Sequence, residues 1–398
     1  LRVTARCKHF NFCGGCTWQS LAYEDQLKFK EGIVRETLNH LGGFPEDVVE
    51  RVMRPIIGIS DPWYYRNKME LSFGLSDEGE LKLGFHLPKR RYDVLNVEEC
   101  FLQSATVAEL VGAVRRFAIA EGLTVFHGKR NEGLLKNLII REGKNTGELM
   151  VNLETSMDEF KAIERFATLL TAGVWKGRIN SLIWTRVKQE RGTKTQREHQ
   201  VLSGEAVINE EMHLETGRRL RFEISPDAFF QPNTKQGEVL YATALELAGL
   251  TGEEVVYDLY CGTGTIGLFC AHKAKQIYGF EVVKNAIVNA RENATRNGIK
   301  NAEFEVADVK KLVKQKWSIP KPDVVIVDPP RAGLEGDVCE PISKLGAQKI
   351  VYVSCNPATL ARDLQLLTQL GYRLELVQPV DMFPQTYHIE NVALLVKS

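Results

Sequence analysis

The sequence lacks the features of membrane and secreted proteins. It contains no run of about 18 apolar residues, which a membrane-spanning helix would need, and no charged segment followed by an apolar one at its start. It also has no repeat and no low-complexity tract. We therefore expect a globular protein of the cytoplasm.

The sequence has no excess of charge of either sign, because Lys and Arg together number 51 and Asp and Glu also number 51. A nucleic-acid partner would therefore need a local basic face rather than a basic chain. Hydrophobic residues make up 44% and charged residues 26% of the 398 residues, which suits a globular protein of two or three domains.

The chain changes in pattern near residue 225. Before it, apolar positions spaced through residues 17–42 and ended by two glycines predict a long helix. The strand-like segments of this half are Lys68–Gly74, Leu81–His86, Asn137–Glu142, Gly147–Leu153, Ser181–Val187 and Arg219–Ile224. We therefore expect an α+β domain over residues 1–224 with a mostly antiparallel sheet. From residue 225 to 398, short apolar runs alternate with helical segments, which predicts a doubly wound α/β domain.

The cysteines are distributed unevenly. The chain has eight, at positions 7, 13, 16, 100, 261, 270, 339 and 355. Cys7, Cys13 and Cys16 can converge only if the turn between the last two is tight, and the two glycines between them permit this. Cys100 is the nearest candidate for a fourth ligand. Four thiolates can hold a 4Fe-4S cluster or a zinc ion, and disulfides or free thiols stay open as alternatives.

A nucleotide site is predicted after the strand Val255–Leu259. Three glycines follow within eight residues and let the backbone approach a ligand, and the segment after Thr265 can begin a helix. Glu281 ends the next apolar run, 23 residues after Asp258, at about the distance where such folds place an acid on ribose hydroxyls. A further strand ends near Asp308. The Lys-Ser/Thr pair of a phosphate-binding Walker loop is absent.

Three groups in the second half predict covalent methyl transfer. Asp328, Cys355 and Glu390 stand at expected strand ends and supply a substrate-site carboxylate, a thiol and a candidate base. The nucleotide site precedes all three, so the nucleophile is expected in an enzyme that also binds a nucleoside cofactor. The alternatives are that Cys355 is a small buried strand residue and that Glu390 is an exposed strand carboxylate.

Several motifs occur in an order that is highly specific. They are Cys7–Cys16 with its Cys-x5-Cys-x2-Cys spacing, Phe229–Asn233 (FFQPN), Asp258–Gly264 (DLYCGTG), Asp328–Arg331 (DPPR), Ser354–Asp363 (SCNPATLARD) and His388–Val392 (HIENV). Over essentially the whole chain they resemble the S-adenosylmethionine-dependent RNA 5-methyluridine methyltransferase family. The cysteine opening resembles the 4Fe-4S branch, chiefly 23S ribosomal RNA uridine enzymes and some archaeal transfer RNA enzymes.

The resemblance implies a Rossmann-like class I methyltransferase domain and an N-terminal iron-sulfur and RNA-binding domain. It implies that the Cys355 thiol adds to carbon 6 of uracil, that Glu390 removes the proton from carbon 5, and that Asp328 links the cofactor site to the target base. The residues that it implies around S-adenosylmethionine are Gln231, Tyr260, Thr265, Glu281, Asp308 and Asp328; Thr265 stands where some members have Asn. The implied cluster ligands are Cys7, Cys13, Cys16 and Cys100.

The cluster cysteines favour a uridine in 23S ribosomal RNA as the target, and the T-loop uridine of transfer RNA is the alternative. A buried base must be splayed out of its RNA, so an aromatic and basic channel is expected, and Tyr64–Lys68 and Lys89–Tyr92 have that mixture.

An RNA 5-methylcytosine enzyme is an alternative that Arg331 disfavours, because such enzymes typically have a second cysteine beside the Asp-Pro-Pro segment. A non-enzymatic iron-sulfur RNA-binding module is the alternative from another class. We expect no membrane association and no obligate protein partner.

Overall fold

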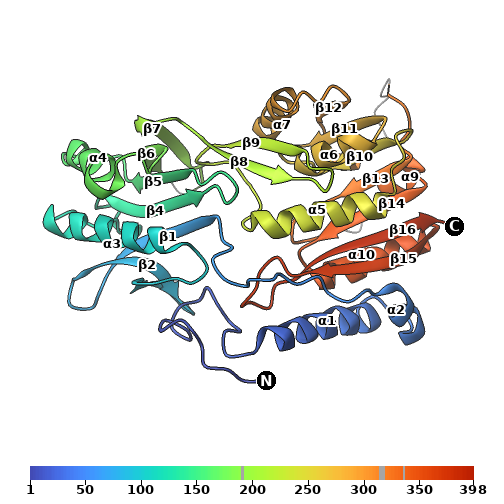
Figure 1. Cartoon of the computed structure of the whole chain (residues 1–398), viewed down its shortest axis with the longest axis horizontal. Coiled ribbons are helices and arrows are strands. Elements are labelled where there is room, and N and C mark those ends of the chain that lie inside the picture. Colours follow the sequence, from blue (N-terminus) through green and yellow to red (C-terminus); the bar gives the residue numbers. More distant parts are fainter. Residues whose placement is uncertain (190–191, 313–318, 335–336) are drawn as a thin grey trace. The chain divides into compact units, whose positions relative to one another are not determined.

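The computed structural model describes the chain except residues 190–191, 313–318 and 335–336 and the side chains of residues 91 and 92. The described residues form two compact units (Figure 1). Unit 1 contains Leu1–Ala22, Asp61–Glu211 and Phe222–Thr234, and unit 2 contains Tyr23–Ser60, Met212–Arg221 and Lys235–Ser398. Both units are discontinuous in the sequence, whereas the sequence predicted one division, between residues 224 and 225.

Unit 1 is built on a seven-stranded sheet in the order β3-β2-β1-β4-β5-β6-β7. Neighbouring strands are antiparallel except β5 and β6, which are parallel. The strands are β1 (Lys68–Leu75), β2 (Leu81–Leu87), β3 (Arg90–Asn96), β4 (Leu135–Glu142), β5 (Leu149–Thr155), β6 (Ser181–Lys188) and β7 (Gln196–Gly204). The helices are α3 (Ala105–Ala120), α4 (Ile163–Thr171) and the 3-10 helix η1 (Gly173–Trp175). The predicted, mostly antiparallel sheet is confirmed.

Local turn chemistry explains the first hairpin of this sheet. The Ser76 amide donates to the Glu80 carbonyl at 2.8 Å, and Gly79 between them has a φ of +83°, which favours glycine.

One of the strands predicted for the first half does not belong to this sheet. Arg219–Ile224 forms β9, which pairs with β8 (Ile208–His213) in a separate two-stranded sheet.

Unit 2 contains the predicted doubly wound sheet, in the order β12-β11-β10-β13-β14-β16-β15. The first five strands of this order are parallel, and β16 is antiparallel to both β14 and β15. The strands are β10 (Val255–Leu259), β11 (Gln276–Glu281), β12 (Ala302–Val306), β13 (Val324–Val327), β14 (Lys349–Ser354), β15 (Tyr372–Val380) and β16 (Glu390–Lys397). The strand order reverses between β10 and β13, and in such sheets ligands bind beyond the carboxyl ends of the strands at this point.

Helices alternate with the strands of unit 2, as a doubly wound fold requires (Figure 1). They are α1 (Tyr23–His40), α2 (Glu46–Val52), α5 (Thr234–Ala248), α6 (Thr265–Cys270), η2 (Ala271–Lys273), α7 (Lys284–Arg296), α8 (Val309–Leu312), α9 (Cys339–Leu345) and α10 (Pro357–Gln369). The central strands β10 and β13 are buried at every position, which explains why their sequences are continuous apolar runs broken only by Asp258.

Helix α1 is shorter than the helix predicted over residues 17–42. Leu21 pairs with Arg2 in an isolated antiparallel bridge, so the backbone before Tyr23 is extended. From Tyr23 on, the residues that face inward recur at four-residue spacing, and Val34 and Leu38 pack in the same core as Leu367 of α10. This packing is why an N-terminal helix belongs to the unit that contains the C-terminus.

A buried ion pair fixes α1 to the segment after β15. The Lys30 ammonium lies 2.6 Å from the Asp381 carboxylate, and both side chains have no exposed surface. The Tyr23 hydroxyl donates to the same carboxylate at 2.8 Å. Burial lowers the pKa of Lys30, and the charge of Asp381 opposes this effect. Each charge is tolerated at this depth only because the other is present.

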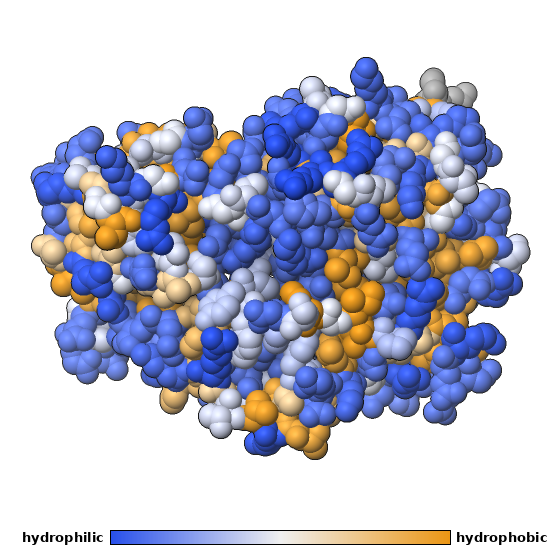
Figure 2. All heavy atoms as spheres, in the orientation of Figure 1, coloured by the Kyte–Doolittle hydropathy of each residue, from blue (hydrophilic) through white to orange (hydrophobic). Residues whose placement is uncertain are grey.

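On the face that Figure 2 shows, hydrophilic residues predominate and apolar residues gather in separate patches. No helix within the described part of the chain is long and apolar enough to cross a membrane.

The Lys30–Asp381 pair leads to a stability prediction. Lys30→Met leaves a buried carboxylate without its cation and should lower the free energy of unfolding by about 3 kcal/mol. The matched control is Lys28→Met on the same helix, where the side chain is 77% exposed, and it should change the free energy by less than about 0.5 kcal/mol. Chemical denaturation of both variants measures the difference. Equal stability of the two variants would contradict the role given to this pair.

Candidate active site

The carboxyl ends of the parallel strands in unit 2 meet at one edge of the sheet, which we call the carboxyl edge. Asp258 is the fourth residue of β10, Glu281 ends β11, and Asp308 follows β12 by two residues. Asp328 comes directly after β13 and Cys355 directly after β14. Because neighbouring parallel strands are in register, these side chains belong to one edge, as the sequence predicted.

Glu390 reaches the same edge by a different route. It begins β16, which runs antiparallel to β14, and the register places Asn391 opposite Ser354. The residue before Asn391 therefore lies across from the residue after Ser354, so that Glu390 and Cys355 are neighbours. Glu390 is 5% exposed, which excludes the alternative of an exposed strand carboxylate.

The turn that carries Cys355 is held by side chains on either side. Asn356 is the N-cap of α10, and its side chain accepts a hydrogen bond from the Ala358 amide at 3.1 Å. Pro357 occupies the first helical turn, where its missing N–H costs nothing. The Ser354 hydroxyl accepts from the Asn356 amide at 3.2 Å. The thiol therefore lies in a fixed strand-to-helix turn, and Cys355 is partly exposed.

Burial and like charge shape the acid–base properties of these groups. Burial raises the pKa of Asp328 to about 7. Burial, followed by the charge of Asp328, raises the pKa of Glu390 well above its usual range. Burial, followed by the charges of Glu390 and Asp328, also raises the pKa of Cys355. Titratable groups with shifted pKa values in close proximity are typical of catalytic sites.

Arg331 opposes the pKa shifts of Cys355 and Glu390. Its charge acts to lower the pKa of both Cys355 and Glu390. In the sequence, Arg331 ends the DPPR motif and stands where RNA 5-methylcytosine enzymes typically have a second cysteine, and neither observation predicts it as a site residue. Its position three residues after Asp328 was the available signal, because a cation so close to a strand-end carboxylate belongs to the same edge.

The loop after β10 has the backbone expected of a ligand cradle. Tyr260, Gly262 and Gly264 have φ values of +62°, +53° and +79°, and Gly264 is the N-cap of α6. A Cβ on Gly262 would meet nothing within 4 Å, so the backbone borders open space there. The Gly267 amide donates to the Asp258 carboxylate at 2.9 Å, which ties the helix to the strand. Burial raises the pKa of Asp258 to about 7.

Of the other predicted cofactor residues, Glu281 and Thr265 contact this loop, Asp308 follows β12, and Gln231 belongs to unit 1. The Glu281 carboxylate accepts from the Gly262 amide at 3.3 Å, and the Thr265 hydroxyl lies 3.2 Å from that of Thr263. Asp308 accepts from the Lys310 amide at 3.0 Å. Gln231 belongs to unit 1, where its carbonyl accepts from the Asn67 side chain at 2.7 Å.

The four predicted cluster cysteines line one cavity of unit 1. Its volume is about 370 Å³. The residues that line it include Cys7, Cys13, Cys16 and Cys100. All four are partly buried, and none forms a disulfide. The Gly15 amide points to the Cys13 sulfur at 3.4 Å. Across the described residues, no group of three or more His, Cys, Asp or Glu side chains is arranged to hold a single metal ion.

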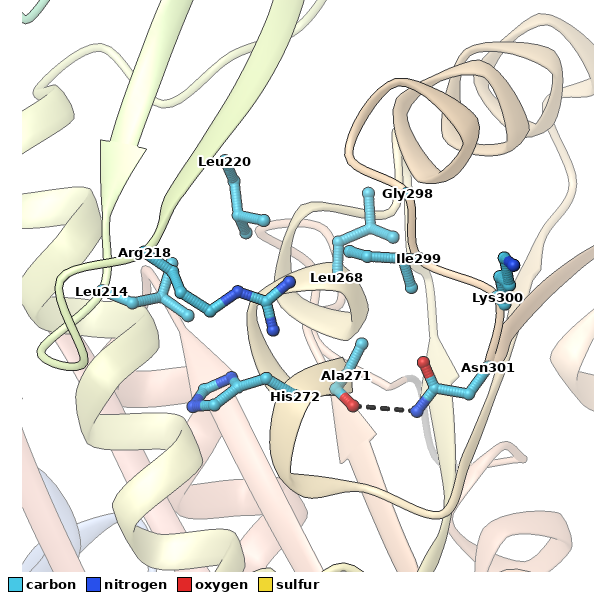
Figure 3. Close-up of a pocket in the computed structure, with 10 residues that line it drawn as sticks. All are labelled: Leu214, Arg218, Leu220, Leu268, Ala271, His272, Gly298, Ile299, Lys300 and Asn301. Carbon is cyan, nitrogen blue, oxygen red and sulfur yellow. Dashed lines mark hydrogen bonds between the residues drawn. The ribbon is translucent and has the colours of Figure 1, made fainter.

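A second cavity, drawn in Figure 3, lies in unit 2 at the edge of the sheet where the parallel strands begin. It has a volume of about 160 Å³, and its lining includes His272, just before β11, and Asn301, just before β12. The Asn301 side chain donates to the Ala271 carbonyl at 2.8 Å, and Arg218 extends towards the space above His272. None of the predicted site residues lines this cavity, so we assign no part of the candidate chemistry to it.

Comparison with known proteins gave matches over the whole chain. The family model described as tRNA (Uracil-5-)-methyltransferase matches residues 190–398. An uncharacterized RNA methyltransferase of Protochlamydia amoebophila is 39% identical over 409 residues, covering 99% of this chain and 91% of that protein. Another from Bacteroides thetaiotaomicron is 40% identical over 414 residues, covering 99% of this chain and 88% of that protein.

One solved structure is similar over nearly the entire length. It is the Pyrococcus abyssi tRNA (uracil-54, C5)-methyltransferase in complex with S-adenosyl-L-homocysteine. The TM-score is 0.75 and the sequence identity 31%, and the match covers 97% of this chain and 86% of that one.

The loop after β10 leads to a binding prediction. A Cβ on Gly264 would lie 2.8 Å from the Phe304 ring, so Gly264→Ala must displace the loop and should weaken S-adenosylhomocysteine binding at least about tenfold, or 1.4 kcal/mol. The matched control is Gly298→Ala, because Gly298 also has a positive φ, +63°, but has no atom within 4 Å of its Cβ position. Calorimetric titration compares the two variants, and equal affinities would contradict the proposed cradle.

Proposed function

We propose that this chain, which belongs to the S-adenosylmethionine-dependent RNA (uracil-5-)-methyltransferase family, methylates carbon 5 of a uridine in RNA through a covalent adduct between Cys355 and carbon 6. The family predicted from the sequence is thereby confirmed, and with it that the protein is an RNA methyltransferase. The observation that carries the covalent mechanism is the β14–β16 register, which makes the partly exposed Cys355 thiol a neighbour of the buried Glu390 carboxyl.

The thiol solves a problem of reactivity. Carbon 5 of uracil is too weak a nucleophile to attack a methyl group bound to sulfur. When the Cys355 thiolate adds to carbon 6, the ring becomes an enolate with electron density at carbon 5, which then forms the new carbon–carbon bond. The bond between Cys355 and carbon 6 breaks in the last step, which returns the electron pair to sulfur and restores the ring.

Glu390 is the proposed base for the last step. Carbon 5 carries both its hydrogen and the new methyl group after transfer, so a base must remove that proton before the thiol can leave. A buried carboxylate with a raised pKa is a stronger base than an exposed one, and Glu390 has both properties. Arg331 favours the ionised forms of Cys355 and Glu390, which are the forms that react.

The residues at the carboxyl edge suit S-adenosylmethionine, which supplies an electrophilic methyl group when bound. The open backbone at Gly262 allows a close approach, and Glu281 and Asp308 offer carboxylates for hydroxyl and amine donors. Asp258 has a buried oxygen without a hydrogen-bond partner among the described residues. We propose that Tyr260, Thr265 and Asp328 complete this set, and the family resemblance adds Gln231.

We propose 23S ribosomal RNA as the target, supported by the resemblance of the cysteine opening to the iron-sulfur branch. The T-loop uridine of transfer RNA is the second candidate. It is favoured by the similarity to the Pyrococcus abyssi enzyme, which is described as acting on uracil 54 of transfer RNA.

We propose that Cys7, Cys13, Cys16 and Cys100 hold a 4Fe-4S cluster. The cavity that these cysteines line supports the assignment, because it brings the thiol of Cys100 together with three thiols that lie more than eighty residues earlier in the sequence. A 4Fe-4S cube spaces its thiolates farther apart than one ion does, so the lack of a single-ion arrangement does not bear on it.

The contacts of the cysteine region suggest a structural role for the cluster. The amides of Tyr64 and Arg66 both donate at 2.8 Å, to the carbonyls of Phe101 and Leu102, directly after Cys100. The Arg6 guanidinium lies 4.3 Å from the centre of the Phe101 ring and donates to the Tyr64 hydroxyl at 3.0 Å. We propose that the cluster fixes this aromatic and basic segment as part of an RNA-binding surface and transfers no electrons.

The covalent mechanism is tested by tritium release from RNA that carries 5-tritiated uridine, offered as 23S fragments or as transfer RNA. Release from one RNA only, abolished in Cys355→Ala, is the expected result. Glu390→Gln should slow release by about 10²- to 10⁴-fold and accumulate a protein–RNA adduct, because the proton stays on carbon 5. Glu375→Gln, a change at a surface acid paired with Arg373, should leave release unchanged. Undiminished release by Cys355→Ala would refute the mechanism.

The cluster is tested with Cys100→Ser. We expect this variant to lose bound iron and sulfide. It should also bind RNA more weakly, because Tyr64 and Arg66, whose amides donate to the carbonyls of Phe101 and Leu102, lose their anchor. Cys270→Ala, a change at a fully buried cysteine of unit 2, should keep its iron. Full iron content in Cys100→Ser would remove Cys100 from the ligand set. Loss of iron with undiminished RNA binding and methylation would contradict the structural role.

A further inference from the structure

The loop after β13 is held by one side of helix α10. The side chains of Asn356 and Thr359 donate to the Arg331 carbonyl at 3.2 Å and 3.4 Å. The Arg362 guanidinium donates to the Ala332 carbonyl at 2.9 Å. These residues and Asp363, which we together call the α10 clamp, recur at three- and four-residue spacing and therefore face the loop from consecutive turns.

Asp363 is the buried centre of the clamp. Its side chain has no exposed surface and accepts from the Leu334 amide at 2.7 Å, the Tyr352 hydroxyl at 2.7 Å and the Arg362 Nε at 2.8 Å. Burial and the charge of Asp363 raise the pKa of Tyr352, so that the hydroxyl remains a donor. One carboxylate thus joins strand β14, helix α10 and the loop after β13 by charge-assisted hydrogen bonds.

The loop approaches Asp363 too closely for any residue but glycine at position 333. Gly333 has a φ of +79°, and a Cβ there would lie 2.5 Å from the Asp363 carboxylate and 2.7 Å from the Arg362 guanidinium. Backbone conformation and side-chain contact therefore fix the same three residues of the loop, Arg331 to Gly333, from two sides.

We infer that Asp363 is a positioning residue that acts through the clamp to hold Arg331 beside the Cys355 thiol. Arg331 begins the clamped segment, and Cys355 directly precedes the clamp residue Asn356, so the clamp joins the backbone of the cation to the backbone of the nucleophile. This inference rests on the proposed thiol chemistry and adds to it the device that keeps a compensating charge in place.

The direction of the effect follows from the charges that face Cys355. Glu390 on β16 and Asp328 after β13 disfavour the thiolate, and Arg331 favours it. If the clamp is released, Arg331 moves away from the thiolate that it stabilises, so the pKa of Cys355 must rise. A purely structural role for Asp363 would lower stability without this shift.

The test is the pH profile of iodoacetamide alkylation at Cys355, followed by peptide mass spectrometry so that other cysteines do not interfere. Asp363→Asn should raise the midpoint of the profile by about one pH unit. At a pH below the pKa of Cys355, this corresponds to alkylation that is about tenfold slower. Arg331→Gln should cause a shift at least as large. The double variant should shift no further than Arg331→Gln alone, because both changes remove one interaction.

Two further variants keep the test decisive. Gly333→Ala attacks the clamp from the loop side and should shift the profile in the same direction, which covers the case that Asp363→Asn does not fold. Asp337→Asn, at an exposed acid paired with Lys310, should have no effect. An unchanged profile in the folded Asp363 or Gly333 variant, or additive shifts in the double variant, would overturn the inference. Alkylation needs no RNA, so failure of the proposed methylation would be seen separately, in the tritium assay.

Discussion

The active site depends on one constraint, which is that strands of a parallel sheet in register end at a common edge. Four chain segments distant in the sequence bring Asp258, Glu281, Asp328 and Cys355 to that edge. The antiparallel strand β16 adds Glu390, because its first residue lies where β14 ends. Without this register the thiol would have no neighbouring base.

The same arrangement creates an electrostatic cost that the site must offset. Burial raises the pKa values of Asp258, Asp328, Glu390 and Cys355. The charge of Asp328 raises the pKa values of the other three groups further. Arg331 is the nearby cation that acts in the opposite direction on Cys355 and Glu390. Its placement by helix α10 connects the fold of the sheet to the reactivity of the thiol.

Much of this edge could be predicted from the sequence, because buried parallel strands are short apolar runs and the residue that follows each run is visible. The ends of β10, β11, β13 and β14 were recognised in this way. Arg331 and Asp363 were not assigned roles, since their importance depends on hydrogen bonds between a loop and a helix that no local pattern encodes. The discontinuous units were missed for a similar reason. Helix α1 is bound to Asp381 by a pair separated by more than three hundred residues.

The measurement that tests the central claim most directly is mass spectrometry of the protein after incubation with S-adenosylmethionine and substrate RNA that contains 5-fluorouridine. Fluorine at carbon 5 cannot be removed as a proton can, so the adduct should persist. We predict a peptide in which Cys355 carries a fluorouridine nucleotide with one added methyl group. Methylation of unmodified RNA with no such adduct, or an adduct on another residue, would contradict it.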